Sequence, residues 1–169
     1  MRWILLAVAL MALSARPSFG SCDGAEERLA SVQAALSKGQ ASAIESNLAV
    51  LAKSHPDCPQ ALALRAQVHA MKGQAQEAEA LFVRAVELAP DQPEPLFRLG
   101  AFYDGRQQNR KAAEQFQKVV RLTPGDPQAF DYLGLSLEAI GQIDKAEQAY
   151  ETGLSVNRGP RFDSMLYYN

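Results

Sequence analysis

Residues 93–126, PEPLFRLGAFYDGRQQNRKAAEQFQKVVRLTPGD, decide the fold because the 34 residues that follow them, PQAFDYLGLSLEAIGQIDKAEQAYETGLSVNRGP, keep the same pattern. A proline opens each copy, and Pro59 opens an earlier one at the same interval. Two further sets of residues keep this spacing: Ala78, Ala112 and Ala146, and Phe82, Phe116 and Tyr150. A fixed period of this length predicts a stack of similar units that bury their apolar faces against one another.

Each unit reads as two amphipathic helices. Its apolar residues recur at intervals of three, four and seven, which is helical periodicity and not the alternation of a strand. Asp126-Pro127 is a favourable helix start, because the carboxylate accepts backbone N–H bonds and proline needs no donor in the first turn. Gly100 and Gly134 are small enough to let the two helices of a unit approach closely. The sequence therefore predicts an all-α fold.

The motifs LFRLGAFY…AAEQFQKVVRLTP and FDYLGLSL…GQIDKAEQAYETGL resemble the tetratricopeptide repeat (TPR) family. The resemblance implies a right-handed α-solenoid of helix–turn–helix repeats, with units at 59–92, 93–126 and 127–160. The sequence departs from the family pattern at three positions. Arg65 replaces an expected leucine, Gln107 stands where the turn usually has glycine, and Arg158 replaces the closing proline.

Residues 21–58 hold a weaker copy of the unit without its small and aromatic signature residues. Terminal units of a solenoid are expected to be atypical because one of their faces has no neighbour. Antiparallel helices return the chain to its starting point, so Cys22 and Cys58 are expected to lie close together. A disulfide between them would close the loop that contains this degenerate unit and would stabilise it.

Residues 1–20 have the layout of a secretory signal peptide. Arg2 is followed by an uncharged run from Trp3 to Leu13, and small residues precede a cleavage point after Gly20. The apolar run is short for a membrane span, although an uncleaved anchor or a buried helix is the alternative. We therefore expect an exported protein of bacterial type, in the periplasm or secreted, with association with the envelope as the alternative.

Cys22 has three possible fates. A disulfide with Cys58, the only other cysteine, suits an oxidising compartment. Lipidation of Cys22 fits less well, because Arg16 and Pro17 separate the cysteine from the apolar run. Two unpaired cysteines are the third reading. Association with a membrane is expected only if Cys22 is lipidated or the leader stays attached.

Composition and motifs argue against catalysis. The 17 basic and 19 acidic residues nearly balance, so no clustered basic surface for nucleic acid is indicated. His55 and His69 share no metal-ligand spacing, and neither a phosphate-binding loop nor a nucleophile elbow is present. We expect no enzyme activity, no cofactor, no bound metal and no small-molecule substrate.

The remaining expectation is protein binding. In the family, the first helix of each unit lines a concave wall, and the resemblance carries this role to the following residues: Met71, Phe97, Arg98, Asp104, Gln128, Asp131 and Tyr132. Aromatic residues and arginine dominate interface energetics, which favours Phe97, Arg98 and Tyr132. The alternative is that Phe97 and Tyr132 are only partly exposed between helices. Ala63 and Gln67 replace the lysine and asparagine of the members that clamp chaperone C-termini, so that activity is not expected.

Two functions are compatible with this pattern. The first is a non-catalytic scaffold that binds a peptide segment of another protein in its groove. The second is a structural or assembly component that self-associates or is lipid-anchored in an envelope complex. The apolar tail, residues 161–169, serves either as a cap that folds over the last helix or as a docking peptide.

Overall fold

The structure is a computed structural model that describes residues 22–158, and this part of the chain contains eight α-helices and no strand. The predicted signal segment and the tail at 161–169 lie outside the described residues. In chain order the helices are α1 (Glu26–Ser37), α2 (Ala41–Ser54), α3 (Pro59–Met71), α4 (Ala75–Leu88), α5 (Pro93–Asp104), α6 (Asn109–Leu122), α7 (Pro127–Ala139) and α8 (Ile143–Arg158).

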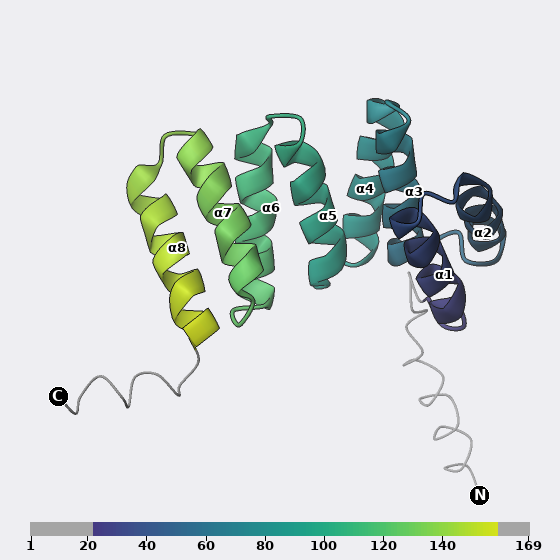
Figure 1. Cartoon of the computed structure of the whole chain (residues 1–169), viewed down its shortest axis with the longest axis horizontal. Helices are drawn as coiled ribbons and strands as arrows, with labels where there is room; N and C mark the ends of the chain where they lie inside the picture. The colour runs from purple at the N-terminus through teal and green to yellow at the C-terminus, as the bar shows by residue number, and fades with distance from the viewer. Residues whose placement is uncertain (1–21, 159–169) are drawn as a thin grey trace, which may run out of the picture.

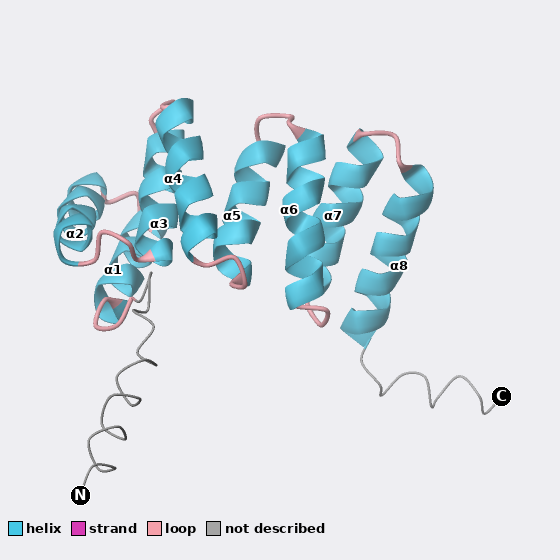
Figure 2. Ribbon diagram, turned by 180° about the vertical axis from the view of Figure 1, so that it is seen from behind, coloured by secondary structure: helices cyan, strands magenta, loops and turns pink. Residues whose placement is uncertain are grey.

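The helices form antiparallel pairs that stand side by side in chain order, from α1 and α2 at one end to α7 and α8 at the other (Figures 1 and 2). The first helices of the last three pairs begin at the prolines of the repeat. Asp126 caps α7 as expected, since its carboxylate accepts the backbone N–H of Gln128 at 3.0 Å. The predicted all-α solenoid is confirmed.

The glycines of the first helices allow close packing within a unit. A Cβ atom added to Gly100 would lie 2.9 Å from the Phe116 ring, and one added to Gly134 would collide with the Tyr150 ring. Phe116 is fully buried. The repeated aromatic residue of the second helix therefore fills the space above the glycine of its own unit.

The first unit departs from this arrangement. Val32 and Ile44 stand where later units have a small residue, such as Gly100 and Ala112, so the helices of the first unit cannot approach in the same way. Figure 1 shows α2 almost end-on, whereas the helices from α3 to α8 stand upright and are seen from the side. The sulfurs of Cys22 and Cys58 are bonded in this structure, which ties the start of the first unit to the start of α3.

Within residues 22–158, every helix is too short or too polar to cross a membrane.

Candidate functional site: hollows beside the first helices of the units

A hollow of about 400 Å³ lies between α3 and α5, and we call it the first hollow. It is lined by Gln67 and Ala70 from α3, Phe82 from α4, and Glu94, Phe97, Arg98, Ala101 and Phe102 from α5. Three phenylalanine rings and two alanines make most of this lining apolar. Such a mainly apolar cavity with a few polar groups is typical of binding sites.

The rings around the first hollow are held by aromatic packing. Phe102 packs against Phe82 with ring centroids 5.3 Å apart, and the Arg106 guanidinium lies 5.7 Å from the centre of the Phe102 ring. Phe97 contacts Phe116 edge-on at 5.5 Å. The wall of the hollow is therefore continuous with the core.

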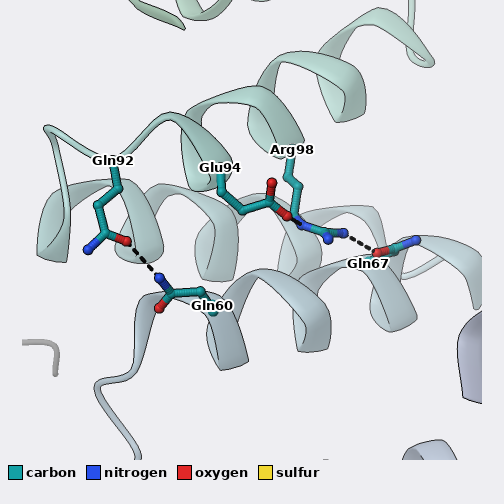
Figure 3. A network of polar contacts seen from close by, with 5 residues as sticks. All are labelled: Gln60, Gln67, Gln92, Glu94 and Arg98. Carbon is teal, nitrogen blue, oxygen red and sulfur yellow. Dashed lines mark hydrogen bonds and ion pairs between the residues drawn. The ribbon is translucent and has the colours of Figure 1, made fainter. Parts of the chain in front are cut away.

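The rim of the first hollow is polar and its charges are paired (Figure 3). Arg98 forms an ion pair with Glu94, in which Nε donates to Oε1 at 2.6 Å, and its Nη1 donates to Gln67 Oε1 at 2.6 Å. Nearer the start of both helices, Gln60 Nε2 donates to Gln92 Oε1 at 2.7 Å. Side chains of α3 thus contact residues of α5 and of the loop before it at two points.

A second hollow of about 430 Å³ adjoins the first, and Gln67 and Arg98 line both. Its other lining residues come from α1 and α3: Gln33, Leu36, Ser37, Leu64 and Met71. Met71 is 69% exposed, the largest exposed fraction among the exposed large hydrophobic side chains of the described residues. The two hollows therefore lie on either side of a shared pair, Gln67 and Arg98, and together take their lining from the first three units.

The structure brings only some of the predicted site residues together. Met71, Phe97 and Arg98 line these two hollows, and Gln128 lines a smaller one of about 220 Å³ that also includes Phe97. Asp131 is exposed and Asp104 is half-buried, and neither lines any of these three hollows. Their predicted role in binding stays a prediction.

Tyr132 has a packing role. Its ring stacks on Phe116 at 5.2 Å and meets the edge of Phe97 at 5.1 Å. Both Tyr132 and Phe97 are half-buried against the core. Truncating either ring would disturb the contact between the unit at 93–126 and the unit at 127–160. A loss of partner binding in such a variant could therefore come from lost packing.

Sequence reasoning missed Phe102 and the contribution of α1. Phe102 stands at a position that does not repeat: the units before and after have Val68 and Ser136 there. That lack of repetition was the available signal. Gln33, Leu36 and Ser37 belong to the degenerate unit, and only the tertiary arrangement places them beside Met71. Ala63, one of the family's groove positions, is fully buried here.

A polar cluster on α4, α5 and α6 connects two repeats. The Tyr103 hydroxyl donates to Glu79 Oε1 at 3.0 Å, Lys111 Nζ donates to the same oxygen at 3.0 Å, and Nζ lies 4.7 Å from the centre of the Tyr103 ring. Burial, followed by the hydrogen bond to Glu79, raises the pKa of Tyr103 to about 12. The hydrogen bonds from Lys111 and Tyr103 lower the pKa of Glu79.

The described residues contain no group of three or more His, Cys, Asp or Glu side chains placed to hold a metal ion. His69 is hydrogen-bonded through Nδ1 to Gln74 at 2.9 Å, and His55 contacts Ser54 and the backbone oxygen of Asp23. Both histidines therefore take part in local hydrogen bonding at the ends of helices.

Three tetratricopeptide repeat family models match the sequence, at residues 29–93, 69–134 and 129–160. The matches overlap, so together they run without a break from residue 29 to residue 160, far more than half of the chain. The protein belongs to the tetratricopeptide repeat family. The first match includes most of the degenerate unit. No curated protein sequence matches the chain significantly.

Solved structures show the same fold. A crystal structure of MamA superposes with a TM-score of 0.67 at 21% identity, covering 80% of this chain and 79% of that one. A MamA RS-1 double mutant gives 0.66 at 23% identity, covering 79% and 75%. The Sgt2 TPR domain from Aspergillus fumigatus gives 0.54 at 25% identity, covering 60% and 67%. These neighbours share the fold, and the family matches support a module for protein–protein interaction.

Proposed function

We propose that the protein is an exported, non-catalytic binding module that holds a peptide segment of a partner protein across the first and second hollows. The first hollow carries this proposal: three phenylalanines surround an open apolar space beside paired polar groups. Apolar walls of this kind supply binding energy, and a few polar groups orient the bound chain. A preformed site also limits the ordering cost of binding to the partner's side.

The proposed location is the periplasm, the secreted fraction or the cell envelope, and it rests on the signal-like residues 1–20 and on the two cysteines. A disulfide between Cys22 and Cys58 is consistent with an oxidising compartment. Mass spectrometry of the mature N-terminus tests this part. A chain starting at Ser21 supports export of a soluble form, a diacylated Cys22 supports a lipid-anchored form, and an intact Met1 contradicts cleavage.

Self-association is the second candidate function, and one observation favours it. Val86 and Val120 pack toward the unit that follows them, whereas their counterpart Leu154 in α8 is 54% exposed. A second copy stacked on this face would extend the solenoid. Analytical ultracentrifugation of the mature chain and of a Leu154→Ser variant separates the two functions. An assembly component should sediment as an oligomer that the substitution dissociates, whereas the mass of a monomeric binding module should stay the same.

A site-specific photo-crosslinker tests the binding proposal. Placed at Met71, whose side chain is exposed in the second hollow, it is expected to capture a partner polypeptide from a native envelope extract. The matched control is Val50 in α2, which is exposed but lines neither hollow. Mass spectrometry then identifies the linked segment. Equal capture from both positions, or capture only of a second copy of this chain, would contradict the proposal.

A further inference from the structure

Among the residues that the structure describes, Arg98 is the only positively charged side chain that lines the first or the second hollow, and it is already paired with Glu94. Its side chain is 23% exposed, and both its Nε and its Nη1 have partners, Glu94 and Gln67 respectively. A free guanidinium would offer a fork of donors that matches a carboxylate. Here one oxygen of Glu94 already binds Nε of Arg98, so the carboxylate of an incoming chain terminus would meet like-charge repulsion from Glu94 at this arginine.

Apart from Arg98, Glu94 and Ser37, the polar residues that line the two hollows are two amides, Gln67 and Gln33. Two further amides, Gln60 and Gln92, are bonded to each other at the helix starts drawn in Figure 3 and line neither hollow. An amide both donates and accepts hydrogen bonds. The two lining amides are therefore suited to the alternating N–H and C=O groups of an extended backbone, whatever side chains that backbone carries.

The apolar lining of the first hollow favours a bound segment that carries one bulky side chain. Phe82, Phe97 and Phe102 surround the first hollow, with Ala70 and Ala101 leaving room between them. A charged side chain placed there would lose its hydration without gaining a free partner, because Glu94 and Arg98 already neutralise each other. An aromatic or large aliphatic side chain would instead bury apolar area against the rings.

From these three observations we infer that the site takes an internal, uncharged, extended segment that anchors one bulky apolar side chain in the first hollow, and that it does not select a free carboxyl terminus. This inference rests on the proposed binding function and adds the chemistry of the partner. Glu94 is its central residue: by occupying Arg98, Glu94 sets the preference against terminal carboxylates.

The test uses two libraries of random segments of about twelve residues, a length that spans roughly 40 Å when extended. One library displays the segments tethered at both ends, and the other displays them with a free carboxyl terminus. The purified mature protein is expected to enrich the first library, for segments with one aromatic or large aliphatic residue and few charges. Enrichment only from the second library, enrichment of acidic segments, or no enrichment from either library overturns the inference.

The best enriched segment is then synthesised with an amidated end and, truncated just after the anchor, with a free carboxylate. The native protein should bind the amidated form at least as well. Glu94→Gln removes the negative charge beside Arg98 and should improve the affinity for the free-carboxylate form relative to the amidated one by about tenfold, the range of one charge-assisted bond. The matched control is Glu87→Gln on α4, an exposed residue that lines neither hollow, and it should change neither affinity. No shift with Glu94→Gln contradicts the role of Glu94.

A second variant tests the anchor without removing any packing residue. Ala101→Leu adds bulk inside the first hollow and should lower the affinity of the segment about tenfold or more, while Ala30→Leu on the exposed face of α1 should not. Circular dichroism verifies that both variants fold. The outcomes also separate the two proposals. If the crosslinker at Met71 links the carboxyl terminus of a partner, the proposed binding function is supported and this inference is refuted.

Discussion

At the scale of single residues, Gln107 has a backbone conformation that is unfavourable for a residue with a side chain. Its φ is +58°, in the left-handed region, where the chain also places Gly39, Gly73 and Gly141 at the same point of the other units. A side chain with a Cβ atom is disfavoured there. The turn is therefore imposed by the packing of α5 against α6 and not by the residue that occupies it.

We expect Gln107→Gly to stabilise the protein by about 0.5–1 kcal/mol, because the relief of the left-handed conformation exceeds the added backbone entropy of the unfolded chain. Urea denaturation should show a higher midpoint with an unchanged slope. Gly141→Ala, at the same point of the next unit and with φ +77°, is the matched opposite and should lower the midpoint. A stabilising Gly141→Ala would refute the explanation.

Gly100→Ala should destabilise the protein by about 1–3 kcal/mol, the usual cost of overpacking a core. The added Cβ would lie 2.9 Å from the Phe116 ring, so the two helices or the ring must move. A double-mutant cycle with Phe116→Leu checks the cause, since a smaller neighbour should recover part of the loss. Purely additive effects would contradict the contact as the cause, because helix propensity by itself favours alanine over glycine.

Tyr103 makes the stability of the fold sensitive to alkaline pH. Its pKa is raised from 10 to about 12, so the folded state holds this proton more tightly than the unfolded state does. The resulting stability is complete below pH 10 and is lost as the pH rises from 10 to about 12. Tyr103→Phe should show a shallower decline of the unfolding free energy over this interval in urea titrations. An identical decline in both proteins would contradict the prediction.

At the scale of elements, the last three units obey the repeat and the first unit does not. α3 to α8 keep a glycine or alanine at the helix crossing and an aromatic residue above it, whereas α1 and α2 carry Val32 and Ile44 at the small positions. Figure 2 shows that α2 is turned away from the orientation of the other second helices, and the larger residues account for this difference. In this structure the bond between Cys22 and Cys58 connects the first unit to the regular part of the stack.

Reduction of that disulfide should therefore loosen α1 and α2 more than the other helices. The chain-entropy model gives about 3–4 kcal/mol for a loop of this length, since the cysteines are 36 residues apart. Hydrogen exchange with and without a phosphine reductant should show faster exchange in α1 and α2 while α5 to α8 keep their protection. The control is Cys22→Ala. It is preferred to Cys58→Ala because the Cys58 sulfur also accepts the Ala61 N–H at the start of α3. A reductant effect that persists in Cys22→Ala would exclude the disulfide as its source.

At the scale of the whole molecule, the candidate site is a product of stacking. The first hollow needs α3, α4 and α5 together, and the second needs α1, α3 and α5, so no single unit contains either hollow. Core and site are also connected through Phe97, which lines the first hollow and contacts the buried Phe116. Substitutions that test binding must avoid this connection.

Two substitutions should separate core from site across the molecule. Phe116→Ala leaves a cavity at a fully buried position and should cost about 3–5 kcal/mol of stability. Met71→Ser removes an exposed side chain, and its effect on stability should stay within about 0.5 kcal/mol. Thermal or urea denaturation compares the two variants. A large loss with Met71→Ser would remove Met71 from the list of residues free to contact a partner.

The sequence by itself determined the fold class, the repeated units with their helix starts, and the residues that pack, because these follow from a period that recurs in the chain. It indicated Met71, Phe97 and Arg98 as site residues only through the family resemblance. The tertiary structure alone decided which positions meet across units. In the folded chain Ala63 is buried and the Tyr132 ring packs on Phe116. Residues of α1 and Phe102 line the hollows, and Arg98 is paired with Glu94 and Gln67. The physical reason is that a repeat specifies contacts common to all units, whereas a site arises from residues that differ between units and meet only when the units stack.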